Sequence, residues 1–175
     1  MPIILHGAGP QLDAALASAD VPTVKHEGLR VTTPEVMEIA RPVIYRANRQ
    51  IVTALENQGV RAQGIQHGVF ECDFLDRDAL GLVGDIRRVD LEAIDDAVKQ
   101  RVLPVVACLG ESRTGQVMNI NADFAARELI WAVQPHKIAG GKTVGIYMSA
   151  LGFGYSADVL KEKGVPHDFV ELEGA

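Results

Sequence analysis

The sequence predicts an α/β protein, a three-layer αβα sandwich in which a mainly parallel sheet is covered by helices on both faces. Short apolar runs typical of buried strands alternate along the chain with segments whose apolar residues recur at helical spacing. The 175 residues are 47% hydrophobic and 23% charged, and no apolar stretch is long enough to span a bilayer. We therefore expect one soluble globular domain.

A glycine-rich turn follows the first predicted strand. Residues 2–10 read Pro-Ile-Ile-Leu-His-Gly-Ala-Gly-Pro, an apolar run and then the turn, and a helix is predicted at 11–18. Gly7 and Gly9 let backbone N–H groups approach an anion, and the positive end of the helix points to the same place. His6 is placed to fix the turn by hydrogen bonding. A tight strand-to-helix connection explains the same residues, so the turn alone assigns no function.

The longest predicted helix runs from Pro34 to Gly59, with proline in its first turn and glycine at its end. Thr32 can cap it, and Glu35 completes a capping box with Thr32. Pro42 should kink the helix or split it into two, because proline lacks an N–H group and clashes with the preceding turn. The apolar residues share one helical face: Val36, Ile39, Ala40, Val43, Ile44, Ala47, Ile51, Val52 and Leu55.

The remaining elements are shorter. Four segments predict strands: residues 60–65, 69–74, 82–86 and 103–109, of which the first three suggest a small β excursion. Two predict helices: residues 91–100, which Asp90 can cap, and residues 124–133, which end before a proline. The tail predicts strand, helix and strand at 143–148, 156–163 and 169–172, and can close a sheet.

Charge and cysteine content narrow the class of partner. The formal net charge is −6 and no Lys or Arg cluster is present, which argues against nucleic-acid binding, so we expect a small-molecule partner and no membrane contact. Cys72 and Cys108 lie in apolar, strand-like surroundings without CxxC spacing, and the N-terminus shows no secretory leader. We interpret both as small buried hydrophobes in a cytoplasmic protein. The histidine spacing suits no metal site.

Three polar residues remain ambiguous on the residues alone. Asn119 and Asp123 lie where a strand or loop leads into the last helix, and either can cap that helix or contact a ligand. Arg30, an isolated arginine ahead of the long helix, is by itself typical of a solvated surface group, although its planar fork can bind a carboxylate bidentately.

Five ordered motifs carry a family resemblance: residues 5–11, 28–32, 68–70, 81–84, and Gly115-Gln116 together with 119–123. From Ile3 to Ile138 the chain resembles the amino-acid kinase family, and within it the N-acetylglutamate kinase branch related to kinase-like domains of N-acetylglutamate synthases. The resemblance implies an acceptor-substrate domain at 1–138, with 139–175 as a divergent β-α-β-like tail that completes the same domain.

The resemblance implies that ATP, with Mg²⁺, phosphorylates the side-chain carboxylate of N-acetylglutamate in arginine biosynthesis. Backbone N–H groups of Gly7, Ala8 and Gly9 would bind the phosphoryl group, with Gly7 and Ala8 also contacting substrate. Ala8 replaces a glycine common in the family, which a negative φ would accommodate.

The same resemblance assigns the ambiguous polar residues. Arg30 would hold a carboxylate of the amino-acid substrate, and Asn119 would bind its acetylated amino group. Asp123 would organise catalysis by orienting cationic groups, since a carboxylate needs no general base at pH 7.

The departures from the family leave two other functions open. We expect no counterpart here of the family's first strand, with its Lys-x-Gly-Gly motif, or of its nucleotide-binding half. A regulatory domain could keep the acceptor pocket without chemistry, as in an N-acetylglutamate synthase. An assembly domain would use helix Pro34–Gly59 to form a homodimer or higher homo-oligomer.

Overall fold

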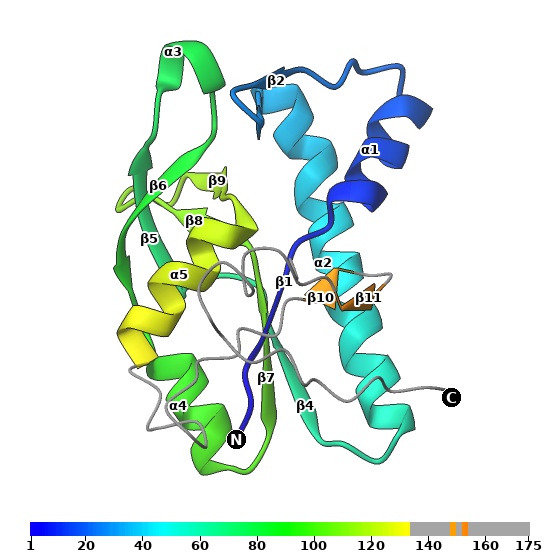
Figure 1. The fold of residues 1–175 in the computed structure, drawn as a ribbon, viewed down its shortest axis with the longest axis vertical. Coiled ribbons are helices and arrows are strands. Elements are labelled where there is room, and N and C mark those ends of the chain that lie inside the picture. The colour runs from blue at the N-terminus through cyan, green and yellow to red at the C-terminus, as the bar shows by residue number, and fades with distance from the viewer. Residues whose placement is uncertain (134–147, 150–151, 154–175) are drawn as a thin grey trace, which may run out of the picture.

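The computed structural model describes residues 1–133, 148–149 and 152–153 (Figure 1). Its centre is a parallel sheet of three strands in the order β1 (Ile4–His6), β7 (Leu103–Ala107) and β4 (Ala62–Ile65). Val106 pairs with Leu5 on one side and Ile65 on the other, and all three side chains are buried. The predicted parallel sheet is therefore confirmed.

Helices cover both faces of this sheet. Figure 1 shows α1 (Gly9–Ser18) and α2 (Pro34–Asn57) on one side, and α4 (Glu92–Lys99) and α5 (Ala122–Val133) on the other. Apolar contacts between α1 and α2 form one core cluster, and a larger cluster lies between the strands and the α4–α5 layer. The described part of the chain is thus the αβα sandwich that the alternation of strands and helices predicts.

Helix α2 differs from its prediction in two ways. It runs without a break through Pro42, so of the two expected effects the split is wrong, and the kink stays a prediction. Pro42 and Glu38 are both exposed, so the carbonyl group of Glu38 that proline leaves without its helical donor belongs to a residue on the solvent side of the helix. The cap is Thr33, whose side chain accepts a hydrogen bond from the Val36 N–H group, and the predicted cap Thr32 is instead fully buried.

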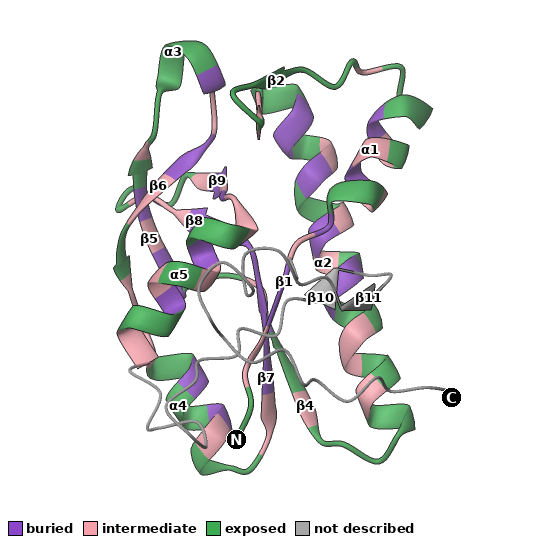
Figure 2. Cartoon of the chain, in the orientation of Figure 1, coloured by how far each residue is buried: buried purple, intermediate pink, exposed green. Residues whose placement is uncertain are grey.

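The first two thirds of the apolar stripe of α2, from Val36 to Ala47, pack inside the monomer. Buried positions alternate with exposed ones along the helix (Figure 2), and Val36, Ala40, Ile44 and Ala47 belong to the two clusters on this side of the sheet. In the described residues, α2 has no exposed large hydrophobic side chain. Dimerisation through this helix stays a prediction, and the part of the stripe left for it is the partly buried C-terminal end with Ile51, Val52 and Leu55.

A second, mixed sheet contains the strands predicted at 69–74 and 82–86, but the strand predicted at 60–65 is β4 of the parallel sheet, so its place in the β excursion is wrong. The order of the mixed sheet is β6 (Gly84–Val89), β5 (Phe70–Phe74), β8 (Leu109–Glu111) and β9 (Val117–Asn119), and only β5 and β8 run parallel. The single strand expected at 103–109 is divided at Cys108, where the chain leaves the parallel sheet as β7 and enters the mixed sheet as β8. Apolar residues continue across the break because both sheets are buried there, so the sequence pattern could not show it.

The remaining elements of the fold are short. A hairpin of β2 (Lys25–His26) and β3 (Leu29–Arg30) and the one-turn helix α3 (Arg77–Leu80) were not predicted. Strands β10 (Met148–Ser149) and β11 (Gly152–Phe153) pair antiparallel. The rest of the tail, including the elements predicted at 156–163 and 169–172, lies outside the described residues. A search of the described helices finds none long and apolar enough to cross a membrane.

Both cysteines are buried and free, as expected. Burial and the neighbouring carboxylates raise the pKa of Cys72 to about 12, and burial raises the pKa of Cys108 as well. Both groups are therefore thiols rather than thiolates at neutral pH, which makes them poor nucleophiles.

Candidate functional site

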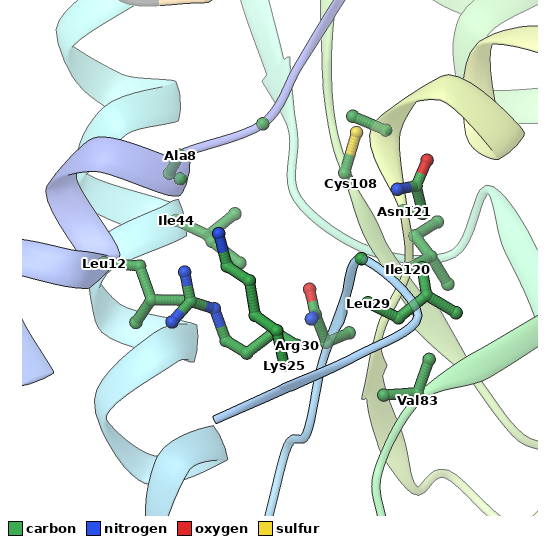
Figure 3. Close-up of a pocket in the computed structure, with 15 residues that line it drawn as sticks. Ala8, Leu12, Lys25, Leu29, Arg30, Ile44, Val83, Cys108, Ile120 and Asn121 are labelled. Atoms are coloured by element: carbon green, nitrogen blue, oxygen red, sulfur yellow. The ribbon is translucent and has the colours of Figure 1, made fainter. Parts of the chain in front are cut away.

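A cavity of about 230 Å³ lies where the β1–α1 turn, the β2–β3 hairpin and the β9–α5 connection meet (Figure 3). It brings together five of the six predicted site residues: Gly7, Ala8, Gly9, Arg30 and Asn119. These residues come from three segments that are far apart in the sequence. Apolar side chains, among them Leu12, Ile44 and Val83, form much of the remaining wall, to which Lys25 and Asn121 also contribute.

The glycine turn presents an uncapped helix end to the cavity. Ala8 is the N-cap residue of α1 with φ −148°, so alanine fits here without strain, as expected. Within the described chain no side chain caps this helix, which leaves N–H groups of its first turn available to an anion. Neither Gly7 nor Gly9 has a positive φ, and a Cβ at Gly9 would meet nothing within 4 Å. The glycines therefore provide access from the cavity rather than an unusual backbone conformation.

A buried pair of polar side chains, His6 and Asn48, holds this turn in place. His6 is fully buried, and its Nδ1 lies 3.0 Å from the Gly7 carbonyl oxygen. Asn48 of α2 donates from Nδ2 to His6 Nε2 at 3.0 Å and to the Val105 carbonyl oxygen at 2.9 Å. Because Nε2 accepts, the imidazole is the neutral tautomer that donates from Nδ1 to Gly7. The predicted role of His6 is confirmed, and Asn48 is an addition that only its polar character on an apolar helix face could have suggested.

The burial of His6 makes stability depend on pH. Burial lowers the pKa of His6 below its ordinary value of 6.5. As pH falls below 6.5, His6 binds a proton in the unfolded chain but stays neutral in the folded chain. The free energy of unfolding therefore decreases. We expect His6→Gln to flatten the curve of unfolding free energy between pH 7.5 and 5.5, measured by urea denaturation, by up to about 1.4 kcal/mol per pH unit. His26→Gln, at an exposed position on β2, is the control and should leave the slope unchanged.

Two cations line the cavity. The side chain of Arg30 is only 9% exposed, and its guanidinium pairs with Asp13 of α1 and donates to Thr23 Oγ1 at 3.2 Å. Lys25, directly opposite Arg30 in the hairpin register, extends its amino group toward Ala8 and Ile44 (Figure 3). In the described part of the chain Lys25 makes no ion pair.

Sequence reasoning missed Lys25, although a signal for its position was present. Glu27 and Gly28 form the two-residue loop of the hairpin, both with positive φ. A residue followed by glycine, both with positive φ, is typical of a tight hairpin turn, and such a turn places Lys25 beside Arg30. The isolated arginine is therefore a cavity residue with a second cation next to it, and not a solvated surface group.

The capping question at α5 is settled by a third residue. Asn121 Oδ1 accepts hydrogen bonds from the N–H groups of Asp123 and Phe124 at 2.8 and 3.2 Å, so Asn121 caps the helix. Capping by Asn119 or Asp123 is not observed. Asn119, at the end of β9, instead donates from Nδ2 to Thr32 Oγ1 at 3.2 Å and lines the cavity.

Asp123 lies at the margin of the site. It is exposed in the first turn of α5 and does not line the cavity, but its negative charge contributes to the raised pKa of Cys108, which does. The described residues contain no group of three or more His, Cys, Asp or Glu side chains that could hold a metal ion.

Comparisons with known proteins identify relatives of this chain in sequence and in fold. The chain is 47% identical over 137 residues to the acetylglutamate kinase of Xanthomonas campestris pv. campestris and 48% identical to that of Xylella fastidiosa strain 9a5c. Each match covers 78% of this chain but 32% of the relative, so the chain spans about a third of their length. The solved structure of smu.665 from Streptococcus mutans has a TM-score of 0.73 at 30% identity, over 75% of this chain and 56% of that one.

The family model described as the amino acid kinase family matches residues 1–150, which include every element that lines the cavity. The chain belongs to the amino acid kinase family.

Proposed function

We propose that this chain supplies the acceptor-substrate side of an N-acetylglutamate kinase, which transfers the γ-phosphoryl group of Mg-ATP to the side-chain carboxylate of N-acetylglutamate in the cytoplasm. The observation that carries the proposal is the cavity in which Arg30 and Lys25 face the uncapped N-terminus of α1. The relatives named acetylglutamate kinase support the choice of substrate.

The charges of the cavity suit the charges of the ligand. N-acetylglutamate carries two carboxylates at neutral pH, and the cavity offers two cations and a set of backbone N–H donors. Arg30 would hold the α-carboxylate, while Lys25 and the glycine turn would hold the carboxylate that receives the phosphoryl group. Leu12 and Ile44 provide an apolar wall for the methylene groups between them.

Phosphoryl transfer between two anions depends on positioning and charge neutralisation more than on proton transfer. The acceptor carboxylate is already ionised, so the site needs no general base. Asp123, at the edge of the cavity, would orient cationic groups near the acceptor oxygen. Mg²⁺ bound to ATP would neutralise phosphate charge, and no described residue has to ligate it.

Acyl-phosphate formation tests the proposal. With ATP, Mg²⁺ and N-acetylglutamate, we expect a hydroxylamine-trapped hydroxamate that requires all three components. We expect Asp123→Asn to lower its rate by about 10²-fold or more, because the preorganised negative charge is lost. Asp95→Asn is the matched control, since Asp95 is an exposed aspartate in the first turn of α4, remote from the cavity.

The outcomes separate the candidate functions. Binding of N-acetylglutamate without hydroxamate would show that this chain binds the acceptor without turning it over by itself, as the regulatory binding domain would. No binding at millimolar ligand, seen as an unchanged melting temperature, would favour the assembly domain. Full activity of the Asp123→Asn protein would remove the role given to Asp123 but leave the kinase assignment intact.

A further inference from the structure

Thr32 is fully buried next to the cavity, and the helix cap predicted for it is made by Thr33. Its backbone is held on both sides, because its N–H group donates to the Leu80 carbonyl at 2.8 Å and its carbonyl accepts from the Leu82 N–H group at 2.7 Å. A Cβ at Gly81, where φ is +72°, would lie 2.5 Å from that carbonyl oxygen. The surrounding backbone therefore leaves Thr32 little freedom to move.

The hydroxyl of Thr32 donates its single proton to one partner, the Arg30 carbonyl oxygen. Oγ1 lies 3.1 Å from the Arg30 carbonyl oxygen, which can only accept, so the hydroxyl must donate to it. Towards Asn119, 3.2 Å away, Oγ1 can then act only as an acceptor. The atom of Asn119 that faces Thr32 must be Nδ2, because an oxygen there would meet a lone pair without a proton between them.

This geometry fixes which way the Asn119 amide points. With Nδ2 bound to Thr32, the amide oxygen is directed away from Thr32, and in the described part of the chain Oδ1 accepts no hydrogen bond from protein. Asn119 lines the cavity, and its main-chain N–H group is tied to the Leu82 carbonyl at 2.9 Å, so the residue is anchored at both ends. Its free acceptor is therefore available to a ligand in the cavity.

We propose that Thr32 is a positioning residue that orients the Asn119 amide so that the site recognises an N–H donor on the ligand. The inference rests on the proposed function and refines it. A ligand whose carboxylate is held by Arg30 would place the N–H group of an acylated α-amine against Asn119 Oδ1. The same hydroxyl donates to the Arg30 carbonyl oxygen. One buried side chain therefore links Arg30, which would bind the α-carboxylate, with Asn119, which would bind the acylated α-amine.

The test compares two ligands that differ only in this N–H group. The probes are N-acetylglutamate and 2-acetoxyglutarate of the same configuration, in which an ester oxygen replaces the N–H. Their dissociation constants are measured by calorimetry for the full chain and three variants. We expect the unaltered chain to prefer N-acetylglutamate about tenfold or more, as the loss of one buried hydrogen bond implies.

Thr32→Val keeps the shape of the side chain but removes the acceptor, and we expect the preference to fall below about threefold. Thr32→Ser restores the hydroxyl and should restore the preference. Thr33→Val is the matched control: it removes the neighbouring hydroxyl that caps α2, and should lower the melting temperature while leaving the preference unchanged.

Each result has one reading. A preference retained by Thr32→Val, or lost equally in Thr33→Val, would overturn the role of Thr32, as would equal affinity of the unaltered chain for the two ligands. Failure of the unaltered chain to bind N-acetylglutamate at all would instead refute the proposed function. If Thr32→Val proves too unstable to titrate, a loss of the preference in Thr32→Ser would still overturn the role of the hydroxyl, since serine keeps that group.

Discussion

Replacing Gly64 by alanine is expected to lower the free energy of unfolding by about 3 kcal/mol or more. An added Cβ at this position in β4 would overlap the side-chain oxygen of Asn48, and it would also contact Val52 at 3.5 Å. Asn48 is fully buried and can retreat only by giving up its hydrogen bonds to His6 and to the Val105 carbonyl. The loss therefore combines a steric clash with unsatisfied buried polar groups.

Urea denaturation followed by circular dichroism measures this effect. Gly9→Ala is the control, because its Cβ would meet no protein atom within 4 Å and its φ is not positive, so we expect stability to change by less than about 1 kcal/mol. Equal stabilities of the Gly64→Ala and unaltered proteins would mean that the contact between α2 and β4 is looser than described. The Asn48–His6 pair would then not hold the glycine turn.

The second large effect concerns ligand affinity. We expect Arg30→Met to weaken binding of N-acetylglutamate by about 30- to 150-fold, corresponding to the 2–3 kcal/mol of a hydrogen-bonded ion pair. Within the described residues Asp13 and Thr23 use only two of the five N–H donors of Arg30, so the guanidinium can still bind a carboxylate. Arg30→Lys should recover part of the loss, because it keeps the charge without the planar fork.

Calorimetric titration with N-acetylglutamate measures the change. Arg87→Met is the matched control, since Arg87 is also paired with carboxylates, those of Asp73 and Asp85, but lies on the exposed surface of the mixed sheet. The affinity of the Arg87→Met protein for N-acetylglutamate should stay within about twofold of that of the unaltered chain, because only a surface ion pair is lost. An Arg30→Met protein that binds as tightly as the unaltered chain would show that the substrate carboxylate is held elsewhere.

The local parts of the fold were predictable because they depend on neighbours in the sequence. The strand before the glycine turn, the helix after it and the stripe of α2 follow from patterns a few residues long, and the structure confirms them. The boundary errors have local causes too. Thr32 and Thr33 are equally good capping residues, and one apolar run contains both β7 and β8.

The site required contacts between distant segments. Asn48 was one polar residue in a helix until the fold placed it 3.0 Å from His6, and Lys25 had no assigned role until the hairpin register set it beside Arg30. Thr32 looked like a cap because its partner, Asn119, follows 87 residues later. No periodicity records the 87 residues between Thr32 and Asn119, whereas the hairpin turn at Glu27 and Gly28 was a local signal for Lys25 that went unused.

The sequence by itself determined the α/β class, the order of the main elements and, through its motifs, the amino acid kinase family. Tertiary structure alone decided that Gly7, Arg30 and Asn119 share one cavity, and that Asp123 stands at its margin. The physical reason is the difference in range: backbone hydrogen bonding and burial of one face act between near neighbours. The charges and hydrogen bonds of a site act across space, once the packed sheets and helices have fixed where each side chain points.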